Sequence, residues 1–119
     1  MIRKKWLAVV ALFGGSLCAQ NPIVPPGVFA ADPEGHQWKD GRLYLYVSRD
    51  ESPDFYCSWR YDLLSTDDLK NWTIHRDAFA SKGPNDEVPY SDGELYASDA
   101  AYKDGKYYLY NSMRDAIDE

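Results

Sequence analysis

The chain has 119 residues, of which 45% are hydrophobic and 27% charged, a composition that is typical of a globular protein and argues against a disordered chain. Its formal net charge is −6. Once Arg3, Lys4 and Lys5 are set aside, 10 basic residues face 19 acidic ones, which gives −9. So acidic a chain repels phosphate groups, which argues against nucleic acid and an anionic membrane surface as partners.

The first 19 residues have the pattern of a secretory signal peptide. Three basic residues precede the apolar run WLAVVALF at 6–13, which is too short to span a bilayer. Small residues at 14–19 predict cleavage near Ala19, so we interpret 1–19 as the signal and 20–119 as the mature domain. An N-terminal membrane anchor is the alternative. Export to the periplasm or the medium would leave Cys57 as the single cysteine, which cannot close an internal disulfide.

Beyond the signal, the sequence predicts an extended leader and then β-structure. The leader, NPIVPPG at 21–27, has three prolines in seven residues, which forbid a helix. Alternating aromatic and β-branched residues favour strands, and Ser, Thr, Asp, Gly and Pro mark the turns and loops between them. The predicted elements are strands at 42–48, 59–65 and 72–75, a side-chain-capped turn at 65–68, and a loop at 80–93.

An internal repeat is the most informative feature of the chain. KDGRLYLYVS at 39–48 recurs as KDGKYYLYNS at 103–112, 64 residues later, with seven of ten positions identical. Each copy predicts a strand, an Asp-Gly turn and an aromatic strand, although two common hairpins can also match by chance. Recurring β-units of this size indicate propeller blades. Because a propeller needs at least four blades, we expect the chain to be an N-terminal fragment holding one blade and the start of a second.

An aspartate precedes each copy of the repeat. If Asp32 and Asp99 stand at the axis of neighbouring blades, their carboxylates converge on one pocket, as general acid–base chemistry and glycoside hydrolysis require. The alternative is that each aspartate caps a turn. Glu34 and His36 flank Asp32 and either orient it or lie at the surface. Residues 49–50 end a strand and either reach the pocket rim or form a solvated turn.

Three elements in order carry a resemblance to a known family. AADPEGH at 30–36, LSTDDLKNWT at 64–73 and LYASDAAYKDGKYYLY at 95–110 resemble the start of a family 43 glycoside hydrolase, in its β-xylosidase and α-L-arabinofuranosidase branch. The resemblance implies a five-bladed β-propeller, of which this chain covers the first blade and the start of the second. It also implies inverting hydrolysis of xylose- or arabinose-containing plant polysaccharide or oligosaccharides.

The same resemblance implies roles for individual residues. Asp32 matches the general base, which takes a proton from the attacking water. Tyr96 and Ala97 match residues that line the sugar subsite, and we interpret Asp99 as a carboxylate near that pocket, with bonding to backbone N–H groups as the alternative. The glutamate that protonates the leaving group, and the aspartate that tunes its pKa, belong to later blades.

The sequence also departs from the family pattern and leaves alternatives open. Many relatives have Trp and Pro where this chain has Tyr96 and Ser98. A carbohydrate-binding propeller without catalysis is therefore the second hypothesis for the whole protein. Without the general acid, the isolated chain is expected to be inactive and poorly folded. No zinc-ligand spacing, phosphate-binding loop or dinucleotide fingerprint occurs, so the sequence predicts no metal and no cofactor.

Overall fold

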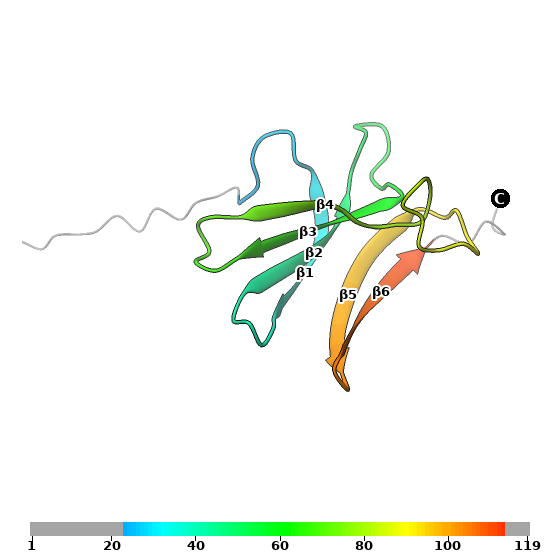
Figure 1. Ribbon diagram of the computed structural model, residues 1–119. Helices are drawn as coiled ribbons and strands as arrows, with labels where there is room; N and C mark the ends of the chain where they lie inside the picture. Colours follow the sequence, from blue (N-terminus) through cyan, green and yellow to red (C-terminus); the bar gives the residue numbers. More distant parts are fainter. Residues whose placement is uncertain (1–22, 114–119) are drawn as a thin grey trace, which may run out of the picture.

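The computed structural model describes residues 23–113, and all regular elements in this range are β-strands (Figure 1). The strands are β1 (Ala30–Gln37), β2 (Leu43–Arg49), β3 (Arg60–Thr66), β4 (Thr73–Ala80), β5 (Leu95–Lys103) and β6 (Lys106–Met113). The predicted all-β class is confirmed. The predicted signal peptide lies outside the described residues. Between residues 23 and 113 no helix is long and apolar enough to cross a membrane.

The strands form two antiparallel sheets. β1 to β4 pair in chain order as a four-stranded sheet, and β5 and β6 form a separate pair. β2 and β3 begin within one residue of their predicted positions, but β4 continues to Ala80 instead of ending at 75. The alternation of polar and apolar residues does not predict this continuation. The register of β3 and β4 shifts opposite Asp62, where Asp77 adopts a left-handed φ of 55° and interrupts the alternation.

The two copies of the repeat form two hairpins, as predicted, but their turns differ. In β5–β6, Asp104 and Gly105 both have positive φ and form a two-residue turn between the paired Lys103 and Lys106. In β1–β2 the same KDG letters form a three-residue loop, in which only Gly41 is left-handed. Trp38 and Arg42 flank that loop, with the Trp38 N–H donating to the Arg42 carbonyl at 3.4 Å.

Gly105 provides a test of the tighter turn. Its φ is +81°, and a Cβ added there would meet no heavy atom within 4 Å, so the effect of a side chain is purely conformational. We expect Gly105→Ala to lower the free energy of unfolding of the whole protein by about 1–2 kcal/mol, the cost of a left-handed L-residue. Denaturant unfolding measures this, with Lys103→Ala as the control. An unchanged midpoint for Gly105→Ala would contradict the turn assignment.

Buried apolar side chains lie on both faces of the first sheet: Val47 pairs with Asp62 in the ladder, so Val47 and Leu64 share one face, and Tyr61 lies on the other, from which its hydroxyl donates to the Ala97 carbonyl of β5 at 3.5 Å. Val47, Tyr61 and Leu64 from the first sheet and Leu95 from β5 are all at least 98% buried. The Leu95 N–H donates to the Ser58 carbonyl at 2.8 Å, which joins β5 to the segment before β3.

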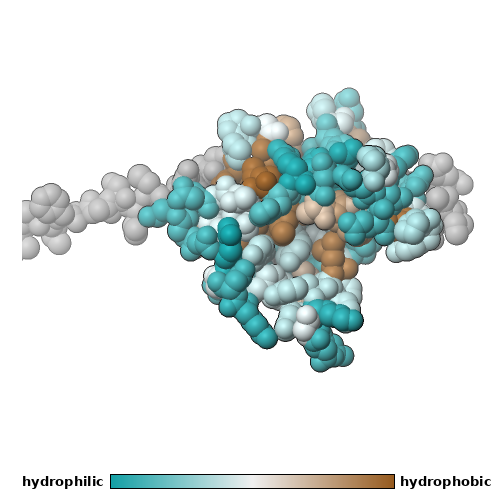
Figure 2. All heavy atoms as spheres, viewed as in Figure 1, coloured by the Kyte–Doolittle hydropathy of each residue, from teal (hydrophilic) through white to brown (hydrophobic). Residues whose placement is uncertain are grey.

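The hairpins β1–β2 and β5–β6 point the same way, and their tips are hydrophilic (Figures 1 and 2). Near these tips Trp38 contacts Tyr107 edge-on at 5.1 Å between ring centres, and the Lys39 ammonium lies over the Tyr102 ring. These contacts hold β1 and β5 side by side, so that residues from both strands can share one site.

Candidate functional site

Both hairpins carry a bulge at the same place in the repeat. The register shifts between Ala31 and Glu34 in β1, and between Leu95 and Ser98 in β5, which is 64 residues further on in each case. Asp32 and Tyr96 therefore occupy equivalent positions, and Asp99 is not the counterpart of Asp32. Bulges re-aim side chains and are common next to active sites. This equivalence was missed in the sequence because the two bulges share no residue type.

Asp32 has the backbone of a constrained site. Its φ of 47° is left-handed, which is rare outside glycine, although aspartate tolerates it better than most residues. The Ser48 hydroxyl of β2 donates to the Ala31 carbonyl at 3.3 Å and fixes the start of the bulge. The Asp32 residue itself is exposed, so its carboxylate is open to water.

The negative charge of Asp32 raises the pKa of two neighbouring groups. Burial raises the pKa of Asp50, and the negative charge of Asp32 raises it further. Burial also raises the pKa of Tyr61 to about 12, again with a contribution from Asp32. The structure thus brings Asp32, Asp50 and Tyr61 into one neighbourhood, at the ends of β1 and β2 away from the hairpin tips. Residues 49–50 were expected either to reach the pocket rim or to form a solvated turn, and the proximity of Asp50 to Asp32 favours the pocket rim.

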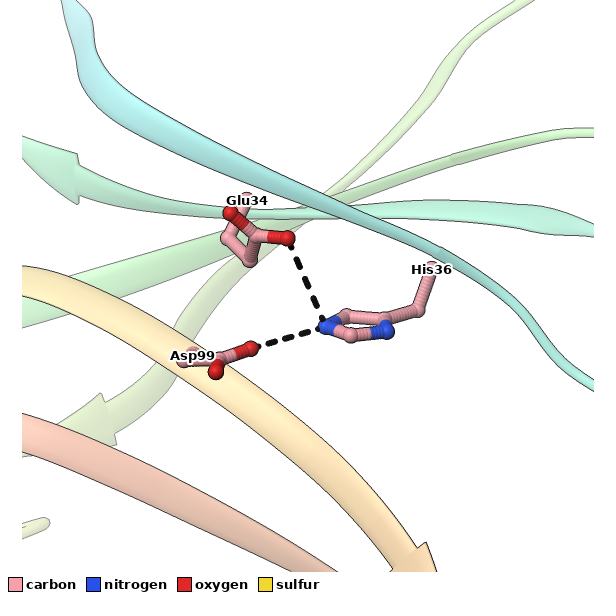
Figure 3. Close-up of side chains that lie close together, drawn as sticks. All are labelled: Glu34, His36 and Asp99. Carbon is pink, nitrogen blue, oxygen red and sulfur yellow. Dashed lines mark hydrogen bonds and ion pairs between the residues drawn. The ribbon is translucent and has the colours of Figure 1, made fainter.

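Asp99 lies in a second cluster, with Glu34 and His36 (Figure 3). The Nε2 atom of His36 lies 2.9 Å from Asp99 Oδ1 and 3.8 Å from Glu34 Oε1. The His36 hydrogen bond lowers the pKa of Asp99, helped by the Ala100 N–H, which donates to the same Oδ1 at 2.6 Å. Because an ionised carboxylate only accepts, His36 Nε2 carries the proton and donates it. The backbone bond that the sequence left as an alternative for Asp99 is therefore present, together with an unforeseen bond to His36.

The Glu34–His36–Asp99 cluster also has the composition of a cation site. One ligand atom from each residue lies within 4.8 Å of the others, and imidazole with carboxylates suits zinc or a similar divalent ion. An ion at this position would have to displace the proton that His36 shares with Asp99. The sequence analysis found no ligand cluster, because His36 and Asp99 are 63 residues apart and only the pairing of two hairpins brings them together.

Tyr96 and Ala97 lie within the β5 bulge. Tyr96 is half-buried, and a hydrogen bond with Cys57 raises its pKa to about 12. Its ring lies 6.1 Å from that of Tyr56, which in turn lies 5.6 Å from Phe55. Ala97 is exposed. The structure thus puts Tyr96 in an aromatic row that the sequence analysis missed, because Phe55 and Tyr56 lie in a loop without a motif.

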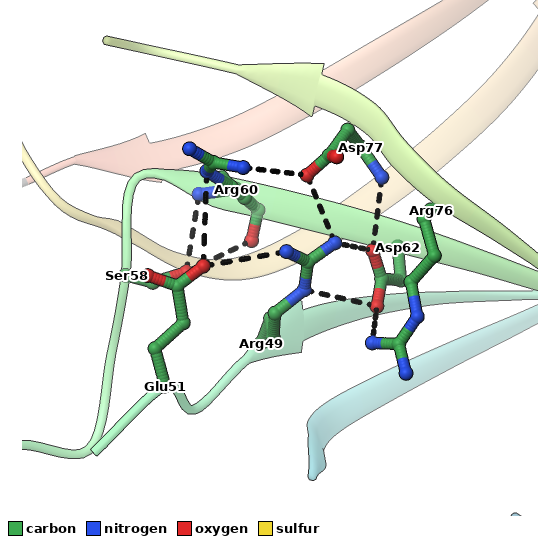
Figure 4. A network of polar contacts seen from close by, with 7 residues as sticks. All are labelled: Arg49, Glu51, Ser58, Arg60, Asp62, Arg76 and Asp77. Carbon is green, nitrogen blue, oxygen red and sulfur yellow. Dashed lines mark hydrogen bonds and ion pairs between the residues drawn. The ribbon is translucent and has the colours of Figure 1, made fainter. Parts of the chain in front are cut away.

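A buried ionic network holds the end of β2 next to this site (Figure 4). The carboxylate of Asp62, which is 2% exposed, accepts from Arg49, from Arg76 at 2.8 Å and from the Asp77 N–H at 3.0 Å. Arg49 also contacts Glu51 at 3.3 Å. Arg49 immediately precedes Asp50, so this network determines where the neighbour of Asp32 lies.

The geometry so far defines an all-β chain in which bulges of two hairpins carry an exposed carboxylate and an aromatic side chain. The chain is similar to a "Xylosidase/arabinosidase" of Bacteroides ovatus, 32% identical over 101 residues, and to a "Xylosidase/arabinosidase 43A" of Humicola insolens, 35% identical over 96 residues. The matches cover 78% and 74% of this chain, and the resemblance to family 43 glycoside hydrolases predicted from the sequence is confirmed. No protein-family model matches the chain.

The chain corresponds to only part of each of these relatives. The matched residues span 30% of the length of the Bacteroides ovatus protein and 29% of the Humicola insolens protein.

Proposed function

We propose that this chain is the N-terminal part of an inverting glycosidase that acts on xylose- or arabinose-containing plant polysaccharide or oligosaccharides. The observation that carries the proposal is Asp32, an exposed carboxylate in a strained bulge, within a chain that resembles two xylosidase/arabinosidases. The whole fold would be a five-bladed propeller. In it, the β1–β4 sheet is the first blade and the β5–β6 pair begins the second.

In the proposed reaction Asp32 is the general base. Its carboxylate accepts a proton from a water molecule while the water oxygen forms a bond to the anomeric carbon of the sugar. The bond between that carbon and the leaving oxygen breaks, and the leaving oxygen takes a proton from an acid. Within residues 23–113 we assign no residue to that acid, which on this proposal belongs to a later blade, so the 119-residue chain would be inactive by itself.

Tyr96 and Ala97 are proposed to line the sugar subsite. Tyrosine offers a flat apolar ring face for a sugar and keeps a hydroxyl at its edge. Its bond with Cys57 holds the ring in place. On this proposal Asp99 does not contact the sugar itself, because its hydrogen bonds are with His36 and the Ala100 N–H. We also propose that residues 1–19 are a signal peptide that exports the protein.

Hydrolysis by the whole protein tests this function. Aryl β-D-xylopyranoside and aryl α-L-arabinofuranoside serve as substrates, and proton NMR follows the anomer that forms first. We expect release of pentose with the anomeric configuration inverted. A retained configuration would overturn the role of Asp32 as a base. Binding to xylan without release of sugar would instead support the carbohydrate-binding propeller.

A further inference from the structure

Two buried hydroxyl groups reach from the first sheet to the bulges of the site. They belong to Tyr61 and Ser48, which are each 2% exposed and pair directly across β2 and β3. Because paired residues of antiparallel strands point to the same face of a sheet, both side chains lie on one face. The proposed reaction uses neither hydroxyl.

The Tyr61 hydroxyl bonds to both strands of the β5–β6 bulge. In this bulge Tyr96 and Ala97 of β5 lie opposite the single residue Ser112 of β6. A bulge interrupts the ladder and leaves backbone groups without their usual partners. The Tyr61 hydroxyl donates to the Ala97 carbonyl at 3.5 Å and also forms a hydrogen bond with the Ser112 backbone. One side chain of β3 therefore holds both strands of the bulge at the point where their own pairing is interrupted.

The Ser48 hydroxyl bonds to the other bulge. It donates to the Ala31 carbonyl at 3.3 Å, next to Asp32. Asp32 and Tyr96 occupy equivalent positions in the two bulges. Ser48 thus holds the bulge of the proposed base, and its cross-strand partner Tyr61 holds the bulge of the proposed sugar subsite. One pair of residues connects the two halves of the site.

The surroundings of Tyr61 keep its hydroxyl in place. Its ring stacks on that of Phe79 in β4, with 5.9 Å between the ring centres. Burial raises the pKa of Tyr61 to about 12, so the hydroxyl keeps its proton at neutral pH and remains a donor. If the ring moved, the Ala97 carbonyl would lose this donor, and a buried polar group without a partner is unfavourable.

We propose that Tyr61 and Ser48 are positioning residues, which fix the bulge of the proposed base relative to the bulge of the proposed sugar subsite without contacting the substrate. The inference rests on the proposed function and assigns two buried residues to it. A general base must lie within hydrogen-bond reach of the water that it deprotonates, and that water must face the reacting carbon of the bound sugar. Because a misplacement of about 1 Å can cost about 10²-fold in rate, the separation of the two bulges affects kcat directly.

The test compares Tyr61→Phe and Ser48→Ala with wild type in the whole protein, on aryl β-D-xylopyranoside and aryl α-L-arabinofuranoside. Each variant loses one oxygen atom and keeps the rest of its side chain. We expect kcat on the preferred substrate to fall by about 10- to 100-fold with little change in KM, because the groups that bind the sugar remain and only their placement relative to the base changes. A hydroxyl with a purely structural role would lower the midpoint of unfolding and leave the kcat of the folded enzyme unchanged.

The same two strands contain a matched control pair. Tyr44 of β2 lies opposite Ser65 of β3, near the tip of the β1–β2 hairpin. The Tyr44 hydroxyl donates to Asp40 at 2.7 Å, and the Ser65 hydroxyl, which belongs to a residue only 1% exposed, lies 2.9 Å from His75 Nε2. Tyr44→Phe and Ser65→Ala remove the same atoms as the test variants but at the other end of the strands. We expect both to keep the kcat and KM of wild type.

The outcomes separate this inference from the proposed function. Wild-type kcat in either folded test variant, or a raised KM with unchanged kcat, would overturn the positioning role and leave the function intact. Losses of kcat of the same size in the control pair would also overturn it. Circular dichroism checks that each variant is folded, and if Tyr61→Phe is not, Ser48→Ala decides by the same criterion. A wild type that hydrolyses neither substrate would overturn the proposed function and this inference with it.

Discussion

Asp32→Asn in the whole protein is expected to lower kcat for aryl xyloside or arabinofuranoside by a factor of about 10² to 10⁴, the usual contribution of a general base. Asparagine has nearly the same shape and tolerates the left-handed φ of 47°, so the backbone of the bulge should persist. The amide cannot accept the proton of the attacking water. Steady-state kinetics at one pH measures the loss.

Asp104→Asn is the matched control for this experiment. Asp104 is also an exposed aspartate with left-handed φ, 51°, but it lies at the tip of the β5–β6 hairpin. We expect activity and thermal stability to remain those of wild type. Full activity of the Asp32 variant would show that another group is the base.

Asp62→Asn is expected to lower the free energy of unfolding of the whole protein by about 3 kcal/mol. Asp62 is almost fully buried and forms ion pairs with Arg49 and Arg76. The substitution removes the negative charge of Asp62, so the Arg49 guanidinium stays buried next to a neutral amide. Removing one partner of a buried pair costs about 3–5 kcal/mol, and the partial exposure of Arg76 puts this site at the lower end. Denaturant unfolding at neutral pH measures the effect.

The same variant makes a prediction about pH. Burial acts to raise the pKa of Asp62, but its hydrogen bonds from Arg49 and the Asp77 N–H and the nearby positive charges outweigh burial and lower it. A lowered folded pKa stabilises the native state above the unfolded value of about 4, and this contribution disappears as the pH falls through the folded pKa. The difference in stability between wild type and Asp62→Asn should therefore shrink as the pH falls from about 4 through the lowered pKa of Asp62.

Asp67→Asn is the control for the network. Asp67 forms an exposed ion pair with Arg42, 3.3 Å from its Nε, and exposed pairs contribute about 0–1 kcal/mol. A loss of the same size for both variants would contradict the importance of burial at Asp62.

Much of the fold could be predicted because local chemistry determines it. The Tyr-rich strands, the positions of the two Asp-Gly turns and the side-chain-capped turn after β3 each depend on residues within a few positions, whereas the length of each Asp-Gly loop does not follow from its letters. At that turn Thr66 Oγ1 accepts from the Leu69 N–H at 3.0 Å, and Asp68 accepts from the Asn71 N–H at 2.7 Å. The roles of Asp32, Tyr96 and Ala97 follow from the order of family motifs and stay predictions.

Features that depend on distant pairing could not be predicted. The bond of His36 to Asp99 needs β1 and β5 to lie side by side, which the sequence does not state. A pocket lined by Phe29 and residues 50–56 needs Phe29 to face a loop that begins 21 residues later. The continuation of β4 past residue 75 depends on Asp77 bonding to Asp62, which turns a break in the polar pattern into a bulge.

The unequal turns of the two KDG copies have a consequence for anyone who recombines such units. Identical letters form a three-residue loop in one hairpin and a two-residue loop in the other, and each choice shifts the opposing strand by one residue. A shift of one residue exchanges the two faces of a strand. Because the turn letters are identical, the flanking residues decide which loop forms, and a chimera that joins the first strand of one copy to the second strand of the other would combine strands whose registers differ by one residue. Crossover sites therefore belong outside the hairpin, in the segments before residue 30 or between 81 and 94.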